Sequence, residues 1–552
     1  MSAPLRIGNA SGFYGDRFSA MREMLTGGPL DVLTGDYLAE LTMLILGRDR
    51  MKDPKRGYAR TFLRQLEDTL DLALERGVKI VTNAGGLNPA GLAAAIRELN
   101  PQVKVAHVEG DDLLARGFDG ALTANAYLGC WGIVECLNAG ADIVVTGRVT
   151  DASLIVGPAA AHFGWSRDDL DALAGATVAG HVIECGTQAT GGNFAFFTEL
   201  SDVDRPGFPI AELAGDGSSV ITKHDGTGGA VTVDTVKAQL LYEIASPRYL
   251  GPDVTSRFDT IALTQDGPDR VAVGGVRGEA PPDTLKVCVN TLDGFRNSMT
   301  FVLCGLDVDD KAALARRQLE SAVGADGLLW TLARTDHADA DTEETASALL
   351  HVTIKTPDPK RAKAFSRAAV ELALASYPGF TLTSPPGDGT PVGVYRPEYV
   401  PQQAVDHIAV LPDGTRTQIP PPATTADPAV APAEEEPSVV YGATRRVPLG
   451  TIVGARSGDK GGDANLGVWV RDPAAYPWLA AELTVDRLRE LLPEAKDLEI
   501  ERHPLPNLTA LNFVLHGLLG QGVATSTRFD PQAKSLGEWL RSRHVDIPEA
   551  LL

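Results

Sequence analysis

Three polar loops in the first 155 residues carry side chains suited to binding and transforming a small molecule. They follow apolar runs that predict strands, and they comprise Asn83–Pro89, Glu109–Asp112 and Gly147–Ser153. Arg148 has the planar cation that binds carboxylates or phosphates, and Asp151 is a candidate for proton transfer. An aspartate or asparagine before a helix can equally serve only as its N-cap, so both interpretations stay open for Asp151 and Asn88. The predicted substrate contacts from these loops are Asn83, Gly85, Gly86, Asn88 and Arg148.

A second group of candidates lies in two glycine-rich segments between residues 180 and 229. Glu184 and Cys185 are expected where a strand meets a loop, and His224 and Asp225 adjoin a glycine turn. Glu184 and Asp225 could transfer protons, and His224 could orient or protonate an oxygen. The thiol of Cys185 is either a nucleophile or a small buried hydrophobic group. The predicted catalytic residues are therefore Asp151, Glu184, Cys185, His224 and Asp225.

A third polar segment lies near the C-terminus, between two predicted strands. The segment Ala455–Gly467 is rich in glycine but lacks the spacing of a phosphate-binding P-loop. A plain tight turn does not require so many charged groups, so we predict a binding role. Its substrate-binding candidates are Arg456, Asp459, Lys460, Asp463 and Asn465.

A divalent metal is a further possibility, and no other cofactor is indicated. His107, Glu109 and Asp111 alternate along a predicted strand, and His181 and Glu184 could add ligands. None of these spacings is a zinc signature, so the metal ligands stay unknown.

The elements that must position these residues alternate between short strands and amphipathic helices. Apolar residues recur every four positions over 59–76 and predict a helix, followed by strands at 78–82, 103–108 and 142–146. Strand–helix–strand units of this length predict a mainly parallel sheet over residues 1–185. Since ligands bind outside the carboxyl ends of such strands, the three loops should share one edge of the sheet.

The chain divides into a main domain, a linker and a small C-terminal domain. We predict an α/β main domain at 1–400 with an α+β extension from about 186, a Pro/Glu-rich linker at 401–445, and an α+β domain at 446–552. The stretch 420–437 holds six prolines in 18 residues and should lack regular structure.

Composition restricts the classes of function. The 552 residues carry 50 Lys+Arg and 72 Asp+Glu, a formal charge of −22, which argues against binding to nucleic acid or to an anionic membrane. The sequence contains no run of 18 uncharged apolar residues, so no membrane span is predicted. The N-terminus also lacks the apolar region of a secretory signal. Five cysteines without CxxC spacing fit reduced thiols, so a cytoplasmic location is expected.

Seven segments together resemble the acyclic terpene utilisation (AtuA-like) family. They are GNASGFYGDR from Gly8, TGDYLAELTM from Thr34, TNAGGLNP from Thr82, VTGRVTDASL from Val145, HVIECGTQATGG from His181, HDGTGG from His224 and ARSGDKGGDANLGV from Ala455. The resemblance covers nearly the whole chain except the linker. It implies an AtuA-like main domain and a C-terminal ferredoxin-fold-like domain. It also implies a role beside acyl-CoA enzymes in branched terpenoid catabolism, where cleavage of a 3-hydroxy-3-isohexenylglutaryl-CoA-type thioester is one suggested activity.

These observations predict an enzyme acting on a branched acyl-CoA or related carboxylate, with C–C lyase activity as the first choice. The base would be Asp151, Glu184 or Asp225, and Arg148, His224 and backbone N–H groups would hold the oxyanion. One alternative is a hydrolase that uses Cys185. Another is a non-catalytic partner subunit of acyl-CoA carboxylases or hydratases. A homo-oligomer or an association with acyl-CoA enzymes is also expected.

Overall fold

The computed structural model describes residues 3–427 and 442–552, which form two compact units. The first unit contains residues 3–290, the described residues of 395–523, and 530–552; the second contains 291–394 and 524–529. The prediction that 420–437 is unstructured falls largely outside the described residues. Part of the predicted linker belongs to the main sheet, as β19 (Ile408–Val410) and β20 (Arg416–Gln418).

An eleven-stranded mixed sheet forms the centre of the first unit, in the order β11-β12-β8-β7-β1-β2-β3-β6-β4-β19-β20. Five neighbouring strands are parallel: β1 (Leu5–Asn9), β2 (Val32–Gly35), β3 (Lys79–Thr82), β6 (Ile143–Val145) and β4 (Val105–Glu109). The outer strands pair antiparallel: β7 (Pro209–Leu213), β8 (Ser219–Lys223), β12 (Val271–Gly274), β11 (Ala262–Gln265), and β19 with β20. The parallel strands lie within residues 1–185, as predicted there. A mainly parallel sheet is not confirmed for the main domain, because hairpin connections extend both sides.

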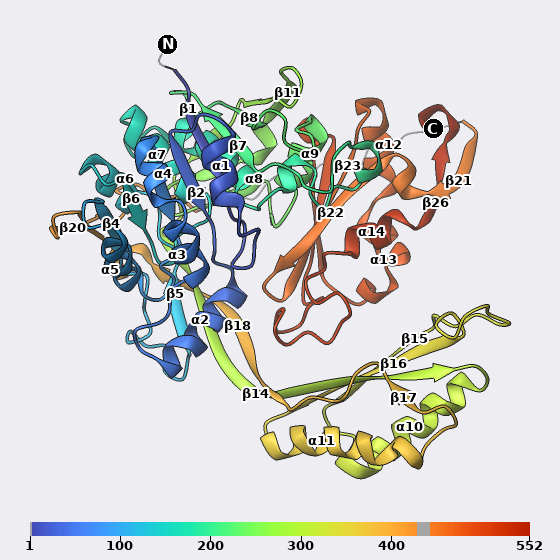
Figure 1. The fold of residues 1–552 in the computed structure, drawn as a ribbon. Coiled ribbons are helices and arrows are strands. Elements are labelled where there is room, and N and C mark those ends of the chain that lie inside the picture. The colour runs from blue at the N-terminus through green and yellow to red at the C-terminus, as the bar shows by residue number, and fades with distance from the viewer. Residues whose placement is uncertain (1–2, 428–441) are drawn as a thin grey trace. The chain divides into compact units, whose positions relative to one another are not determined.

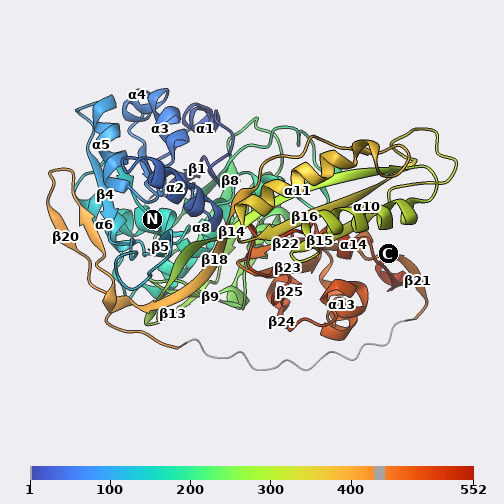
Figure 2. The same cartoon turned by 90° about the horizontal axis from the view of Figure 1, so that it is seen from below.

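Helices cover both faces of this sheet because neighbouring strand residues point in opposite directions. Ile80 belongs to an apolar core with α1 (Ala20–Gly27), α3 (Arg60–Glu67), α4 (Leu70–Glu75) and α5 (Pro89–Leu99), which Figure 2 shows on one side. Val81 belongs to the opposite core with α6 (Trp131–Asn138), α7 (Ser153–Phe163) and α8 (Leu170–Ile183). The remaining helices of this region are α2 (Glu40–Lys52) and α9 (Val233–Leu240).

Helix α8 corrects the expectation that Glu184 and Cys185 follow a strand. Alanine, glycine and valine dominate Leu170–Ile183, and residues 172–183 are buried. These small side chains allow neighbouring segments to approach the helix closely on all sides. The apolar run therefore belongs to a fully buried helix, which cannot be distinguished from a buried strand by periodicity alone.

Two smaller sheets complete the main-domain part of the first unit. The strand β5 (Thr123–Ala126) pairs with the N-terminal half of the long β14 (Thr284–Cys304), to which β18 (Thr390–Pro401) also pairs. A three-stranded sheet contains β13 (Arg277–Glu279), β10 (Thr255–Arg257) and β9 (Arg248–Leu250).

The C-terminal domain has a four-stranded antiparallel sheet packed on helices, as Figure 1 shows. Its strands are β22 (Val453–Lys460), β23 (Asp463–Val470), β25 (Ala510–Leu515) and β24 (Ile500–Leu505); its helices are α12 (Tyr476–Glu482), α13 (Val485–Leu491) and α14 (Leu536–Arg541). Strands β21 (Thr444–Pro448) and β26 (His544–Pro548) form a separate ribbon. The predicted glycine loop 455–467 is instead a continuous β22–β23 hairpin, in which only Gly461 and Gly462 form the turn.

The second unit has its own core. Its elements are the C-terminal half of β14, α10 (Val308–Val323), β15 (Leu328–Ala333), β16 (Ser347–Thr356), α11 (Pro359–Glu371) and β17 (Thr381–Leu382). This β-α-β-β-α-β order, with the sheet order β15-β16-β14-β17, is a ferredoxin-like arrangement. Figure 1 shows α10 and α11 on one face of this sheet. Of the expected α+β extension, residues 291–394 belong to this second unit, whereas residues 186–290 belong to the first. No helix within 3–427 or 442–552 is long and apolar enough to cross a lipid bilayer.

Candidate active site

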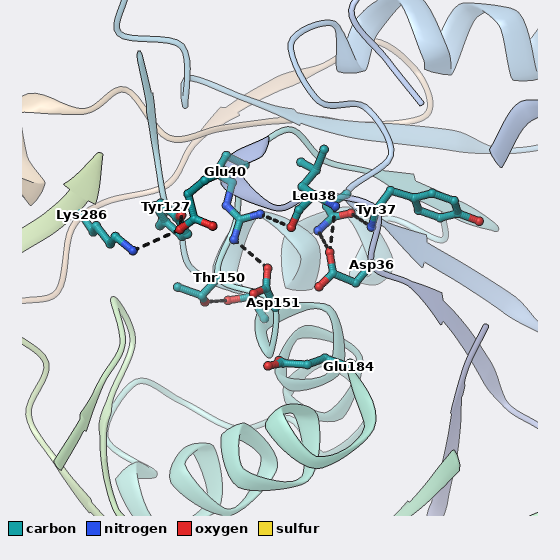
Figure 3. A network of polar contacts seen from close by, with 12 residues as sticks. Asp36, Tyr37, Leu38, Glu40, Tyr127, Thr150, Asp151, Glu184 and Lys286 are labelled. Carbon is teal, nitrogen blue, oxygen red and sulfur yellow. Dashed lines mark hydrogen bonds and ion pairs between the residues drawn. The ribbon is translucent and has the colours of Figure 1, made fainter. Parts of the chain in front are cut away.

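The polar loops meet at one edge of the parallel strands. Because β2, β3 and β6 run in the same direction, their carboxyl ends lead together into residues 36–40, 83–88 and 147–151. In Figure 3 the side chains of Asp36, Asp151 and Glu184 lie below the backbone of the 36–40 segment, to which Asp36 itself belongs. Lys286 approaches Glu40 from one side. The shared edge is the one expected from the strand pattern, whereas the contribution of the 36–40 segment was not predicted.

Arg148 is the buried centre of this cluster. Its side chain is 3% exposed, and Nη1 and Nη2 donate to the carbonyl oxygen of Leu38 (2.7 Å) and to Oδ1 of Asp151 (2.8 Å). The guanidinium carbon lies 4.1 Å from the ring centroid of Tyr127. The backbone N–H of Arg148 donates to Oδ2 of the buried Asp111 (2.9 Å). Arg148 is thus oriented at both its backbone and its side chain.

Two aspartates flank this cation. The Nδ2 of Asn83 donates to Oδ1 of Asp36 (2.5 Å), and the N–H of Leu38 donates to the same oxygen (3.1 Å). Burial, together with the negative charge of Asp151, raises the pKa of Asp36 well above its usual range. Burial also raises the pKa of Asp151, but the positive charge of Arg148 opposes this rise. The side chain of Asp151 stays 31% exposed, so it is the more accessible carboxylate of the two.

Glu184 follows the last turn of α8 and is almost fully buried. Its side chain is 7% exposed, and Oε1 lies 3.2 Å from Nδ1 of His181. Within the described residues, Glu184 Oε2 and His181 Nε2 are buried without a hydrogen-bond partner. Burial and the negative charges of Asp151 and Glu243 raise the pKa of Glu184 well above its usual range. Burial and the positive charge of Lys460 lower the pKa of His181 to about 4, so its imidazole is neutral at pH 7.

A second cation faces the cluster from β14. Lys286 Nζ lies 3.4 Å from Oε1 of Glu40, which also accepts a hydrogen bond from the Tyr127 hydroxyl (2.9 Å). The same Nζ lies 4.9 Å from the Tyr127 ring centroid and 5.6 Å from that of Tyr395. Although burial opposes it, the positive charges of Lys286 and Arg148 bring the pKa of Glu40 to about 2. Glu40 is therefore ionised and balances Lys286.

The β22–β23 hairpin of the C-terminal domain supplies a third cation. Lys460 Nζ donates to the carbonyl oxygen of Glu243 (2.9 Å). Lys460 is exposed, and desolvation by the surrounding chain together with the positive charge of Lys286 lowers its pKa. In the described part of the chain, no carboxylate lies within ion-pair distance of Lys460. Nearby, Lys534 Nζ lies 3.2 Å from Glu243 Oε1 and 3.5 Å from Asp459 Oδ1.

Cys185 and Arg456 lie at the border of the cluster. Arg456 hydrogen-bonds Gln188 and lies 4.5 Å above the Tyr242 ring centroid. Burial and the negative charge of Glu184 raise the pKa of the Cys185 thiol well above its usual range. The thiol is therefore protonated at neutral pH. The guanidinium of Arg456 is held by its contacts with Gln188 and Tyr242.

The structure does not bring His224 and Asp225 into this cluster. His224 Nε2 lies 2.9 Å from the carbonyl oxygen of Met24, and its ring fills the space beside Gly27. Asp225 is exposed in the following turn. Burial lowers the pKa of His224, which fits a packed neutral imidazole.

Several other residues that were predicted to contact substrate instead make contacts within the protein. Asn88 Oδ1 accepts from the Gly91 N–H (2.9 Å) and so caps α5, and Gly85 packs where a side chain would meet the Thr146 carbonyl. Gly86, which has φ +54°, completes that turn. In the hairpin, Asp463 contacts His516 (3.0 Å), and Asn465 accepts a hydrogen bond from the Glu243 backbone (2.7 Å).

The described residues do not bring the predicted metal ligands together. Within residues 3–427 and 442–552, no three His, Cys, Asp or Glu side chains are placed to hold a metal ion together. His107 Nε2 lies 2.8 Å from Glu109 Oε1, whereas Asp111 accepts from Asn125 (2.8 Å) and Arg148.

Sequence comparison assigns the chain to a family. Residues 5–411 match the acyclic terpene utilisation family protein AtuA. The chain belongs to the AtuA family. Residues 447–546 match the AtuA ferredoxin-like domain, so the resemblance noted from the motifs is confirmed over both parts. No match was found among curated proteins.

Proposed function

We propose that this AtuA family protein is an enzyme that cleaves a C–C bond in a branched 3-hydroxyacyl-CoA or a related carboxylate. One observation carries the proposal: Asp151, paired with Arg148, and Glu184, with a free buried Oε2, belong to one electrostatically linked cluster. Arg148 favours the ionised form of Asp151, and burial favours the neutral form of Glu184. A carboxyl group that Arg148 helps to ionise and a carboxyl group whose proton is retained by burial would supply the base and the acid that such a reaction requires.

The proposed reaction is a retro-aldol cleavage. Asp151 removes the proton of the substrate hydroxyl, the resulting oxyanion forms a carbonyl group, and the adjacent C–C bond breaks. The electron pair of that bond passes into the thioester or carboxyl group as an enolate, and Glu184 donates its proton to the enolate carbon. Transfer of the proton from Asp151 to Glu184 then restores the starting state.

Two lysines are suited to stabilise the developing negative charge. Lys286 and Lys460 reach the cluster from β14 and from the C-terminal hairpin, and the charge of Lys286 acts on Lys460. Ammonium groups placed before the reaction stabilise an enolate more strongly than water that must first reorient. An anionic substrate would also balance Lys460, which has no carboxylate partner among the described residues.

The cysteine hydrolase alternative has less support. A thiolate is the attacking species in cysteine catalysis, and the environment of Cys185 favours the protonated thiol. The imidazole of His181, on the same turn, contacts Glu184 instead of a thiol. The proposed reaction therefore assigns no chemical step to Cys185.

The test is to incubate the protein with 3-hydroxy-3-methylglutaryl-CoA, a branched 3-hydroxyacyl thioester, and to follow products by mass spectrometry. We expect a shorter acyl-CoA and a carbonyl compound, with both lost in Asp151→Asn and Glu184→Gln. A saturating thioester, about 100-fold above its Kd, should stabilise the fold by about 2.7 kcal/mol. Stabilisation without turnover by a panel of CoA thioesters would favour the non-catalytic partner subunit.

A further inference from the structure

Glu243 adopts a backbone conformation that is unusual for its residue type. Its φ is +58°, in the left-handed region, where glycine is favoured and asparagine and aspartate are tolerated. The other non-glycine residues with positive φ among the described residues are asparagine, aspartate, threonine and alanine. A glutamate held in this conformation indicates that the surrounding structure imposes it, and such residues cluster at functional sites.

The C-terminal domain holds the turn that contains Glu243. The N–H of Glu243 donates to Oδ1 of Asn465 (2.7 Å). Asn512 Nδ2 donates to the carbonyl oxygens of Ile244 (3.2 Å) and Ala245 (2.6 Å), and its side chain also accepts from Asn465. Two side chains on neighbouring strands β23 and β25 therefore fix three consecutive residues of the main domain.

Glycines on the hairpin allow this close approach. A Cβ at Gly458 would lie 2.5 Å from a ring carbon of Tyr242, and one at Gly467 would lie 2.5 Å from Cβ of Leu241. The glycine pattern that resembles a binding loop in the sequence thus serves as a flat strand surface against the 241–245 turn.

Within this turn, Glu243 contacts two lysines, one through its carbonyl oxygen and one through its carboxylate. The carbonyl oxygen of Glu243 accepts a hydrogen bond from Lys460 Nζ (2.9 Å), and its carboxylate lies 3.2 Å from Lys534 Nζ. Lys534 also contacts the Tyr242 hydroxyl, and its Nζ lies 4.5 Å from that ring centroid. The left-handed backbone lets the main chain and the side chain of Glu243 serve both lysines at once.

We propose that Glu243 is a positioning residue of the site, which orients Lys460 through its carbonyl oxygen and Lys534 through its carboxylate. Asn465 and Asn512 keep it in place, so the C-terminal domain takes part in the reaction by fixing this turn. The inference rests on the proposed function for its kinetic consequence, but the contacts themselves are testable without substrate.

The experiment compares Glu243→Gly, Glu243→Gln and a control, Asp202→Gly. Asp202 also has positive φ (+53°), is exposed and lies outside the described cluster. Glycine keeps the carbonyl contact and removes the carboxylate, whereas glutamine keeps a side-chain acceptor and removes the charge. Each variant is measured by thermal unfolding, by turnover of 3-hydroxy-3-methylglutaryl-CoA, and by mass-spectrometric rates of acetylation at Lys460 and Lys534.

We expect Glu243→Gly to melt no lower than the wild type, because glycine relieves the strained backbone. Its turnover should fall roughly 10- to 100-fold, the effect of misplaced groups in a site. Acetylation of Lys534 should rise by roughly two- to fivefold, the range of an ion pair near the surface, with Lys460 unchanged. Glu243→Gln should recover part of the turnover, and Asp202→Gly should match the wild type in turnover and acetylation.

Two results would overturn the proposal. One is a Glu243→Gly variant with wild-type turnover and wild-type acetylation of Lys534. The other is a Glu243→Gly variant that melts well below the wild type while Asp202→Gly does not, since that would mean that the backbone is not strained. If the wild type itself shows no turnover, the proposed function fails, and the acetylation rates alone decide whether Glu243 orients Lys534.

Discussion

Arg148 Nη2 donates a 2.8 Å hydrogen bond to Asp151 Oδ1, three residues later in the same loop. Nη1 of the same guanidinium donates to the Leu38 carbonyl oxygen (2.7 Å), so the fork links the 147–151 loop to the segment after β2. The ion pair therefore fixes the position of the proposed base and favours its ionised form, against the effect of burial.

Replacing Arg148 with lysine keeps a positive charge at this position but removes the planar guanidinium that contacts both Asp151 and the Leu38 carbonyl oxygen. One ammonium group cannot reproduce the planar fork that reaches both partners. We expect Arg148→Lys to lose about 1.5–3 kcal/mol of unfolding free energy, the range for a hydrogen bond to a charged group, and to lose most turnover. Urea unfolding and initial rates measure these effects.

The matched control is Arg334→Lys in the second unit, where Arg334 pairs with Asp309 and Asp336 at an exposed position. This variant should leave the stability close to that of the wild type, because solvent screens the exposed pair. Equal stability losses in the two variants would contradict the special position of Arg148.

Glu184→Gln should remove the proposed proton donor without harming the fold. Glutamine matches the shape of the neutral acid but has no acidic proton. Because burial raises the pKa of Glu184 in the folded state, the folded protein keeps a proton that the unfolded chain releases above a pKa of about 4.3. Wild-type stability should therefore fall as pH rises from about 4 toward the folded-state pKa, and this dependence should weaken in Glu184→Gln.

Melting temperatures recorded from pH 4 to 8 test this difference, with the exposed Glu67→Gln as a control that should follow the wild type. A Glu184→Gln variant with the pH dependence of the wild type would show that Glu184 ionises normally. Full turnover in that variant would exclude Glu184 as the proton donor.

Strand order explains how much of the site could be predicted. Asn83, Arg148 and Asp151 follow strands β3 and β6, and the rule that parallel strands end at one edge placed them together. The same rule applied to β2 would have found Asp36 and Glu40, because DYLAE directly follows that strand.

Other parts of the site depend on tertiary contacts that no local pattern contains. Lys286 lies within the long strand β14, and Glu243 follows α9 in a turn that is fixed by Asn465 and Asn512. The β22–β23 hairpin was missed for a related reason: a glycine-rich, polar segment predicts a loop, yet here it pairs as two strands against a close neighbour.

Lys460→Ala should weaken ligand binding without lowering stability. The ammonium group donates to one backbone carbonyl and has no carboxylate partner among the described residues. We expect Kd or KM for a CoA thioester to rise roughly tenfold, the effect of losing a charge-assisted contact, while the melting temperature stays near that of the wild type. Calorimetry and steady-state kinetics provide these values.

The exposed Lys496→Ala is the matched control, because its ammonium group lies 3.8 Å from Asp497 at the surface. Its binding and turnover should equal those of the wild type. Unchanged affinity and unchanged turnover in Lys460→Ala would remove the hairpin from the site.

Cys185→Ala should retain turnover, since the raised pKa of the thiol leaves little thiolate at neutral pH. For the same reason, iodoacetamide should modify Cys185 slowly at pH 7 and faster as pH rises. Kinetics of the variant and mass-spectrometric labelling check both statements. Loss of all turnover in Cys185→Ala would return the cysteine hydrolase to first place.

The most direct test of the central claim is hydrogen exchange at the α-carbon of acetyl-CoA in D₂O, followed by mass spectrometry. By microscopic reversibility, Glu184 must remove the α-proton in the reverse direction, after its own proton has passed to Asp151. We predict deuterium incorporation by the wild type, slower incorporation by Asp151→Asn, which lacks the acceptor for the proton of Glu184, and none by Glu184→Gln. Incorporation by Glu184→Gln at the wild-type rate, or no incorporation by the wild type, would contradict the proposed acid–base pair.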